Sequence, residues 1–242
     1  MFKRREKASA RRAPSGKKAP FVSAVVLAAG ASRRMGTDKM TALLAGQSVI
    51  SRTLRALEAC EEISELVLVV REGAEQRVLA GAGGLTKLMR IVHGGDSRTA
   101  SALQGVMACD PRAEIILIHD GARPLVTGEV VRRVVEGAAR FGAAVPVVPV
   151  TDTIKVGKNG FADSTPDRST LYAAQTPQAF RAELIKAALQ DAQKAGLSLT
   201  DDCAAVERLG MRVRLVEGDR RNRKLTTPED LKIAEALWEE TT

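Results

Sequence analysis

The sequence contains few of the residues that support redox, zinc or disulfide chemistry. Only 3% of its 242 residues are aromatic, and it has two histidines and three cysteines. The cysteines, Cys60, Cys109 and Cys203, are odd in number and have no CxxC spacing, so neither a disulfide framework nor a cysteine-based zinc site is expected. Unpaired cysteines are typical of a reducing compartment, and we expect a cytoplasmic protein.

Long apolar segments are also absent. The longest apolar runs have the length of strands and fall short of the ~20 residues that a membrane-spanning helix needs. No contact with a membrane is therefore expected. Because hydrophobic residues still make up 45% of the chain, the core must be aliphatic and rich in alanine, which suits parallel strands covered by helices.

The positive charge is concentrated at one end of the chain. The net charge is +8, but residues 1–20 alone hold eight basic residues and one acidic residue. This segment has no apolar run, so we expect a disordered basic extension rather than a signal peptide. A solvated tail, a nonspecific contact with RNA and an organellar transit peptide are the alternatives for it. The rest of the chain is nearly neutral, so no nucleic-acid partner is expected there.

Strand-like and helix-like segments alternate after the extension. Apolar runs predict buried strands at 21–29, 66–70, 89–92, 115–119 and 143–149. Helical spacing predicts helices at 49–57, 75–79, 97–108, 127–141 and 181–195, a further one after Thr200 and a last one from Thr227. This alternation predicts an α/β fold: a Rossmann-like, mostly parallel open sheet flanked by helices.

Residues 151–173 break this alternation. Gly157, Asn159, Gly160 and Pro166 lie between short β-like pieces, which predicts a protruding β-arm. Such an arm cannot bury its own apolar side chains, so we expect it to grip a second copy of the chain in a homodimer, with a plain surface excursion as the alternative. Residues 21–242 are then a single domain that carries a dimerisation arm.

The first glycine loop indicates phosphate binding. Residues 27–36, LAAGASRRMG, directly follow the first strand, where open α/β sheets bind ligands. Small residues let backbone N–H groups approach phosphates, while Arg33, Arg34 and Lys39 supply positive charge. The loop is neither a Walker A motif nor GxGxxG, which excludes the two commonest nucleotide loops.

A second candidate is the carboxylate of Asp120. It follows the predicted strand 115–119, and a lone carboxylate at that position is suited to Mg²⁺ or another divalent cation. A structural cap for the next turn is the alternative. Arg123 has two interpretations, bracing the loop around Asp120 or contacting a substrate.

These motifs resemble those of the methylerythritol phosphate cytidylyltransferase family. The match extends from about Val22 to Trp238. Besides 27–36, it includes 94–101 (GGDSRTAS), 119–124 (HDGARP), 152–153 (DT), 167–168 (DR), 176–178 (TPQ), 200–201 (TD) and 224–228 (KLTTP). The resemblance implies a nucleotidyltransferase domain that uses CTP and Mg²⁺ to activate a polyol phosphate with release of pyrophosphate, a step in isoprenoid precursor synthesis.

The resemblance also implies roles for individual residues. It places Arg34, Lys39 and Lys224 at the reacting phosphates as catalytic residues. For the CTP site it indicates Ala28, Ala29, Gly30, Gly95, Asp96, Ser101, Asp120 and Gly121. For the phosphorylated acceptor it indicates Thr153, Arg168, Thr200 and Thr226, beside Arg123. Because Thr153 and Arg168 lie in the predicted arm, each site is expected to use them from the neighbouring subunit.

Two departures from the family and two rival functions remain. Asp38 stands directly before Lys39, and Arg221 occupies a position that is usually acidic, for which Asp219 is the candidate replacement. The related ribitol 5-phosphate cytidylyltransferases have the same kind of loop, aspartate and arm. A more remote alternative is a nucleotide- or RNA-binding protein without catalytic activity.

Overall fold

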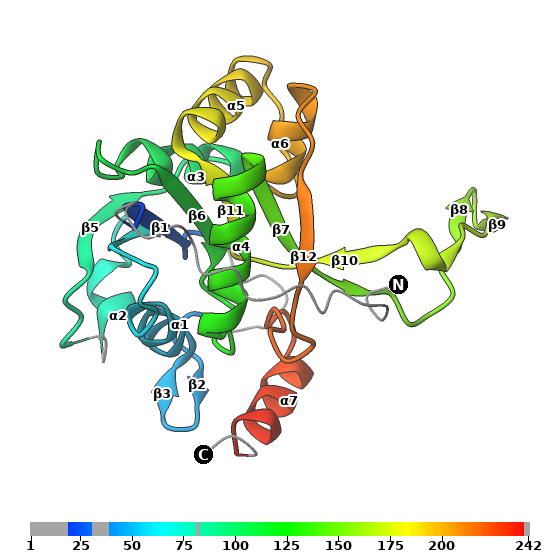
Figure 1. Cartoon of the computed structure of the whole chain (residues 1–242). Coiled ribbons are helices and arrows are strands. Elements are labelled where there is room, and N and C mark those ends of the chain that lie inside the picture. Colours follow the sequence, from blue (N-terminus) through cyan, green and yellow to red (C-terminus); the bar gives the residue numbers. More distant parts are fainter. Residues whose placement is uncertain (1–18, 31–38, 81–82, 240–242) are drawn as a thin grey trace, which may run out of the picture.

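The fold is built on one large mixed sheet whose strands alternate with helices. The computed structural model describes residues 19–30, 39–80 and 83–239. The predicted extension, residues 1–20, therefore lies almost wholly outside the described residues. The central strands β1 (Val22–Leu27), β4 (Glu65–Val70), β5 (Leu88–His93) and β6 (Ile115–Asp120) run parallel, with β1 between β4 and β6. Figure 1 shows helices on both faces of this sheet.

The second half of the sheet contains its antiparallel members. The strand order is β10-β7-β11-β6-β1-β4-β5, and β12 (Arg214–Glu217) pairs in parallel with β7 (Ala143–Pro149). The short strands β10 (Tyr172–Ala174) and β11 (Gln178–Arg181) are antiparallel to β7, and β11 also pairs with β6. The predicted fold class, a mostly parallel Rossmann-like sheet, is confirmed, although the sequence analysis did not predict these two strands.

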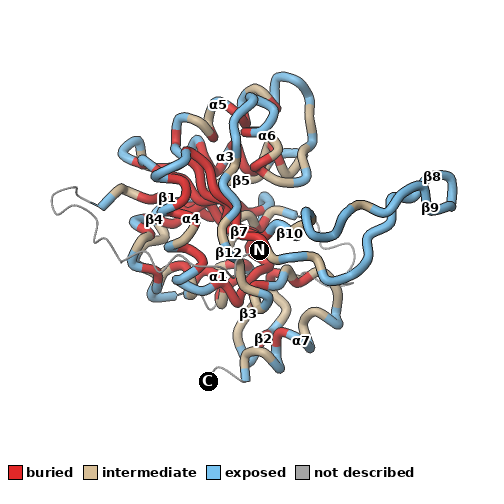
Figure 2. The backbone as a smooth tube through the Cα atoms, turned by 45° about the vertical axis from the view of Figure 1, so that its right-hand side comes forward, coloured by how far each residue is buried: buried red, intermediate tan, exposed pale blue. Residues whose placement is uncertain are grey.

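Alternation along the strands produces two core layers. Successive side chains of a strand point to opposite faces, so β1 sends Ala24 to one layer and Val25 to the other. On the first face the strands pack against α1 (Val49–Glu58), α2 (Glu75–Leu79) and α4 (Gly128–Phe141). On the second face they pack against α3 (Arg98–Met107), α5 (Ala182–Lys194) and α6 (Cys203–Arg208). Figure 2 shows the buried residues concentrated in this sheet.

Side-chain hydrogen bonds cap the start of α1 and α3 but not of α2, α4, α5 or α6. Ser97 accepts a hydrogen bond from the Ala100 N–H at 3.0 Å and so caps α3. Thr127 occupies the N-cap position of α4, but its hydroxyl accepts no capping hydrogen bond. None of the described helices is both long and apolar enough to span a bilayer.

A third, smaller hydrophobic cluster forms around the last described helix. Helix α7 (Pro228–Glu239) packs against the hairpin of β2 (Leu43–Leu44) and β3 (Gln47–Ser48), and Leu225 and Ala234 are fully buried there. The Arg52 guanidinium lies 4.0 Å from the centre of the Trp238 ring, a cation–π contact that ties α1 to α7.

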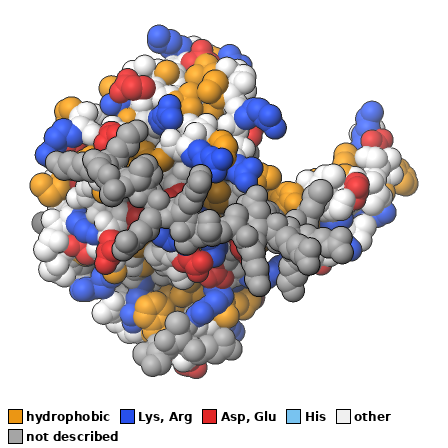
Figure 3. All heavy atoms as spheres, viewed as in Figure 1, with side chains coloured by type: hydrophobic (Ala, Val, Ile, Leu, Met, Phe, Trp, Pro, Cys, Tyr) orange, Lys and Arg blue, Asp and Glu red, His pale blue; other side chains and the backbone are white. Residues whose placement is uncertain are grey.

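The arm leaves the body between β7 and β10. It consists of a hairpin of β8 (Val156–Lys158) and β9 (Phe161–Ser164) followed by the 3-10 helix η1 (Arg168–Thr170). Figures 1 and 3 show that it projects away from the rest of the molecule. Its apolar side chains are uncovered, and Phe161 at the hairpin is 79% exposed.

Candidate active site

A cavity of about 400 Å³ opens at the carboxyl ends of β1, β4, β5 and β6. This is the edge at which open α/β sheets bind ligands, because loops from neighbouring strands converge there. Its lining residues are Leu27, Ala29, Gly30, Lys39, Met40, Arg71, Gly95, Asp96, Ser97, Arg98, Ser101, Asp120, Gly121, Ala122 and Lys224.

Two glycine loops form one wall of this cavity. Gly30 ends the first loop as far as it is described, and Gly95 and Ser101 belong to the second. The Gly95 N–H donates to the Ser101 hydroxyl at 3.1 Å. A side chain on Gly94 would place its Cβ 2.6 Å from Ala29 Cβ and 2.7 Å from Ser101 Oγ, so only glycine lets the loops meet this closely.

Most of the residues predicted for nucleotide binding line this cavity. The exception on this wall is Ala28, which is buried beneath it and donates its N–H to the Val69 carbonyl at 2.7 Å. Arg34 lies outside the described residues. Lys39, at the end of the same loop, does line the cavity.

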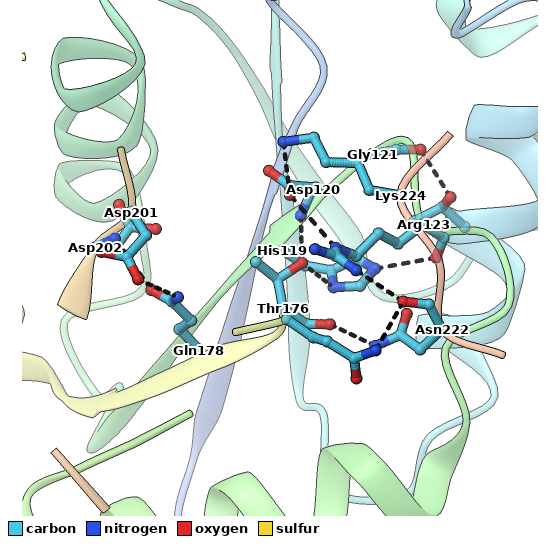
Figure 4. A network of polar contacts seen from close by, with 12 residues as sticks. His119, Asp120, Gly121, Arg123, Thr176, Gln178, Asp201, Asp202, Asn222 and Lys224 are labelled. Carbon is cyan, nitrogen blue, oxygen red and sulfur yellow. Dashed lines mark hydrogen bonds and ion pairs between the residues drawn. The ribbon is translucent and has the colours of Figure 1, made fainter. Parts of the chain in front are cut away.

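Asp120 lies at the base of the cavity among three cations. Its carboxylate is 3.0 Å from the Lys224 ammonium, 3.5 Å from the Arg123 guanidinium and 3.9 Å from the Arg98 guanidinium. Burial by itself raises the pKa of Asp120, but the three positive charges outweigh it and hold the pKa well below the ordinary value. Asp120 therefore stays ionised. Figure 4 shows the Lys224 side chain above Asp120 and Arg123 beside it.

The backbone of Asp120 is held from behind by a chain of hydrogen bonds. The Thr176 hydroxyl accepts from the Asp120 N–H at 3.0 Å and lies 3.0 Å from His119 Nδ1. His119 Nε2 faces the Arg123 carbonyl at 3.2 Å, an acceptor, so Nε2 carries the proton and Thr176 donates to Nδ1. Complete burial lowers the pKa of His119 to about 4, so the ring is neutral at pH 7 and has a structural role.

Arg98 belongs to the second glycine motif, residues 94–101, and its side chain pairs with Asp202. Its guanidinium makes two hydrogen bonds to the Asp202 carboxylate, at 2.9 and 2.7 Å, while still lining the cavity. Burial raises the pKa of Asp202, and the Arg98 charge opposes that shift. The Gln178 carboxamide accepts from the Asp202 and Cys203 N–H groups at 3.0 and 3.1 Å, which fixes the start of α6.

Arg71 was missed by the sequence analysis although it lines the cavity. It follows β4 directly, so the strand-end rule that identified Asp120 would also have found it. Its side chain is exposed and has no hydrogen-bond or ion-pair partner among the described residues.

Several residues predicted for the acceptor lie outside the cavity. The Thr226 hydroxyl donates to Asp230 at 2.7 Å, at the start of α7, and Thr200 is exposed on the loop before α6. Thr153 and Arg168 are exposed on the arm, where Arg168 donates to the Thr151 carbonyl at 2.7 Å.

Arg123 is not placed to meet a substrate in this structure. It is 9% exposed, its Nη1 donates to the Asn222 carbonyl at 2.7 Å, and its Nε faces Asp120. Of its two predicted roles, the geometry favours bracing over substrate contact.

Comparison with known proteins identifies the family of this chain. The sequence profile described as IspD, 2-C-methyl-D-erythritol 4-phosphate cytidylyltransferase, matches residues 22–240. This chain belongs to that family. It is 43% identical over 222 residues to the 2-C-methyl-D-erythritol 4-phosphate cytidylyltransferase of Desulforamulus reducens, covering 89% of this chain and 95% of that protein. The enzyme of the same name from Geobacillus kaustophilus is 45% identical over 218 residues, covering 88% and 95%.

Solved structures agree with this assignment. The 4-diphosphocytidyl-2C-methyl-D-erythritol synthase of Anaerococcus prevotii superposes with a TM-score of 0.83 at 30% identity, covering 92% of this chain and 100% of that chain. The cytidylyltransferase of Thermus thermophilus gives a TM-score of 0.75 at 34% identity, covering 89% and 98%. The resemblance inferred from the sequence motifs is therefore confirmed.

The structure also places the residues at which this chain departs from the cytidylyltransferase pattern. Arg221 points away from the cavity and donates to the Leu237 carbonyl of α7 at 2.9 Å. Asp219 accepts from the Arg221 N–H at 2.8 Å and does not line the cavity. Asp219 thus brings no carboxylate to this cavity. Asp38 lies outside the described residues.

Proposed function

We propose that this protein transfers the cytidylyl group of CTP to 2-C-methyl-D-erythritol 4-phosphate, forming 4-diphosphocytidyl-2-C-methyl-D-erythritol and pyrophosphate for isoprenoid precursor synthesis. The observation that carries this proposal is the cavity itself. In a chain of the cytidylyltransferase family, it brings two glycine loops, Lys39 and the Asp120–Lys224 pair to one strand edge.

The glycine-loop wall is the proposed nucleotide side. Gly30, Gly95 and Ser101 offer backbone and hydroxyl groups at this wall, where a Cβ on Gly94 or Gly95 would lie 2.6 Å from a neighbouring Cβ atom, and this suits a planar base and a close approach to phosphates. Ala28, Ala29, Asp96 and Gly121 complete this side in the proposal. Arg34 and Lys39 are assigned to the triphosphate.

The proposed chemistry needs no side-chain nucleophile or general base. A phosphate oxygen of the acceptor is already anionic near neutral pH, so it attacks the α-phosphorus of CTP directly, in line with the leaving group. The new oxygen–phosphorus bond forms as the bond to the bridging oxygen breaks, and pyrophosphate carries away the electron pair. Catalysis is then positioning and charge neutralisation by Lys39, Arg34 and Lys224.

Asp120 fits a magnesium ion. Mg²⁺ is commonly bound by one or two carboxylates together with substrate phosphates, and Asp120 supplies one ionised carboxylate at the cavity. Its Oδ1 makes no hydrogen bond to a described residue, and the Arg98 guanidinium lies 3.9 Å from it. Among the described residues no three acidic, histidine or cysteine side chains cluster to hold a metal, so nucleotide phosphates and water would complete the coordination. Bound there, the ion would neutralise phosphate charge.

The acceptor side is proposed to involve a second subunit. Thr153 and Arg168 offer a hydroxyl and a guanidinium, the groups that bind a phosphate monoester, but both are exposed on the projecting arm. A homodimer in which each arm reaches the neighbour's cavity brings them to the acceptor. Thr200 is assigned to the same side. A cytoplasmic location is proposed from the three cysteines, all free and buried.

The direct test is pyrophosphate release with CTP and Mg²⁺. Methylerythritol 4-phosphate is compared with ribitol 5-phosphate as acceptor, at equal concentrations and with a no-acceptor control. We expect release with the first acceptor only. Release with ribitol 5-phosphate alone would keep the chemistry but change the substrate, and no release with either would overturn the assignment as a cytidylyltransferase.

A further inference from the structure

Lys224 lies on an irregular connection between β12 and α7, so its position is not set by a strand or helix of its own. Its ammonium must nevertheless reach Asp120, 3.0 Å away. A flexible four-carbon side chain is placed only as well as the backbone that carries it. The residues that fix this connection therefore determine where the charge of Lys224 lies.

One side chain clamps this connection from across β7, since β10 and β12 both pair with that strand. Gln175 follows β10 and is only 6% exposed. Its Nε2 donates to the Asp219 carbonyl at 2.8 Å and to the Asn222 carbonyl at 3.3 Å, while its Oε1 accepts from the Asp219 N–H at 3.2 Å. All three bonds go to backbone groups of the turn that leads to Lys224.

The clamp requires close approach of the two segments. A Cβ on Gly218 would lie 2.5 Å from Gln175 Oε1 and 3.1 Å from the Val147 carbonyl oxygen. Glycine at this position is what lets the Gln175 carboxamide pack directly on the turn. The Gly218 N–H donates to the Val147 carbonyl at 2.9 Å, so the turn is also joined to β7.

The clamped turn is tied onward to the reacting groups. The Asn222 side-chain amide donates to the Thr176 carbonyl at 2.8 Å, and the backbone carbonyl of Asn222 accepts from the Arg123 guanidinium at 2.7 Å. On the other side of Lys224, the Leu225 N–H donates to the Ala122 carbonyl at 2.8 Å. Lys224 is thus held between two anchors, and Figure 4 shows the Asn222 anchor with Thr176 and Arg123 beside Asp120.

We propose that Gln175 is a positioning residue that places Lys224 for the transfer step; this rests on the proposed function, in which Lys224 acts on the reacting phosphates. Gln175 does not line the cavity and so acts through the turn. Because it directly follows the strand by which the arm returns to the sheet, the same residue joins the base of the arm to the backbone of Lys224.

The decisive variant is Gln175→Met, which keeps a similar volume and removes all three hydrogen bonds. Displacing a charged group by about 1 Å costs up to about 100-fold in rate, so we expect kcat to fall roughly 10- to 100-fold, with the KM for CTP changed less than about twofold. Gln104→Met, on the exposed face of α3, is the matched control and should behave as wild type.

A double-mutant cycle separates positioning from general destabilisation. If Gln175 acts through Lys224, then Gln175→Met has almost no further effect on kcat in a Lys224→Ala background. A full additional loss in that background would overturn the proposal. So would wild-type kcat in Gln175→Met accompanied only by a lower melting temperature.

Two further measurements keep the outcome clear. If Gln175→Met does not fold, Gln175→Asn, which keeps the carboxamide but shortens its reach to the Asp219 and Asn222 carbonyls, is held to the same cycle. Wild-type turnover is measured first: its absence contradicts the proposed function, whereas normal turnover in both the wild type and Gln175→Met contradicts the role of Gln175 alone.

Discussion

The cavity and the arm differ in whether a single chain brings their candidate binding residues together. Around the cavity, residues from four strand ends converge, and the Asp120 carboxylate already has cations within 3.0 to 3.9 Å. On the arm, Thr153 and Arg168 are exposed and are not among the residues that line that cavity, and Figure 2 shows the exposed arm projecting from the body. Under the proposed function, the nucleotide side is formed by the folded chain alone, whereas the acceptor side requires the arm of a second subunit.

The largest expected effect tests the cavity side of this comparison. Lys224→Ala and Lys39→Ala each remove a positive charge from the reacting phosphates, and the loss of such a group costs about 2–4 kcal/mol, or roughly 30- to 1,000-fold in kcat. Pyrophosphate release measures the loss, and circular dichroism checks the fold. Lys232→Ala, exposed on α7, is the control. Near-normal rates in both cavity variants would contradict the proposed mechanism.

The second effect tests whether the arm completes a neighbour's site. Arg168→Ala is expected to raise the KM for the acceptor phosphate about tenfold or more, with little change for CTP, because only the acceptor loses a charged hydrogen-bond donor. Steady-state kinetics with each substrate varied in turn measure this split. Equal changes in both KM values would contradict an acceptor-specific role.

Mixing chains of two variants tests directly whether the arm of one subunit reaches the cavity of the other. In a heterodimer of Arg168→Ala and Lys39→Ala chains, one of the two sites has both residues intact if the arms cross over. Random exchange of subunits is therefore expected to restore roughly a quarter of wild-type activity. A mixture no more active than its components would place Arg168 at its own chain's site, or at none.

The strand framework and the strand-end residues could be predicted because their signal is local. Continuous apolar runs identify β1 and β6, and the residues after them, Gly30 and Asp120, follow from the geometry of parallel sheets. Strand β11 gives no comparable signal. It has only four residues, Gln178–Arg181, and exists because β6 and β7 flank it on both sides.

The contacts that support the site could not be predicted because they join residues far apart in the sequence. Gln175 bonds to Asp219, 44 positions away, and Arg98 pairs with Asp202, 104 positions away. A single sequence has no periodicity that links such residues. Thr226 shows the reverse problem: the family resemblance implies that it binds the acceptor, whereas in this structure its hydroxyl donates to Asp230 at the start of α7.

Arg71 offers a smaller effect on the cavity side. Its guanidinium lines the cavity without a partner among the described residues, so a bound nucleotide is the available anion. We expect Arg71→Ala to weaken CTP by about 1 kcal/mol, roughly fivefold in KM, because the site is open to solvent. The acceptor KM should not change, and Arg71→Lys should be intermediate. Arg77→Ala, exposed on α2, is the control, and an unchanged CTP KM in Arg71→Ala would exclude Arg71 from the nucleotide side.

The smallest effect on catalysis is expected at Asp230, which tests the Thr226 assignment. Its carboxylate accepts from the N–H and hydroxyl groups of Thr226 and Thr227, and the Asp230 N–H donates back to the Thr227 hydroxyl, a capping box at the start of α7. Partial burial by itself raises the pKa of Asp230, but hydrogen bonds from Thr226 and Thr227 and the contact with Arg223 lower it to about 2. We expect Asp230→Ala to lower the free energy of unfolding by about 1 kcal/mol at pH 7.

The loss of unfolding free energy in Asp230→Ala is expected to depend on pH. The folded pKa lies below the unfolded value of about 3.9, so the carboxylate stabilises the fold fully above pH ~4 and this stabilisation is lost as the pH falls toward 2. Denaturant unfolding of the wild type and of Asp230→Ala should therefore show a difference in the free energy of unfolding that is constant from about pH 5 to pH 7 and disappears below pH ~4. If Thr226 serves mainly as a cap, the acceptor KM of Asp230→Ala stays near wild type. An acceptor KM raised as much as in Arg168→Ala would instead place the Thr226 hydroxyl at the acceptor and weaken the division between cavity and arm.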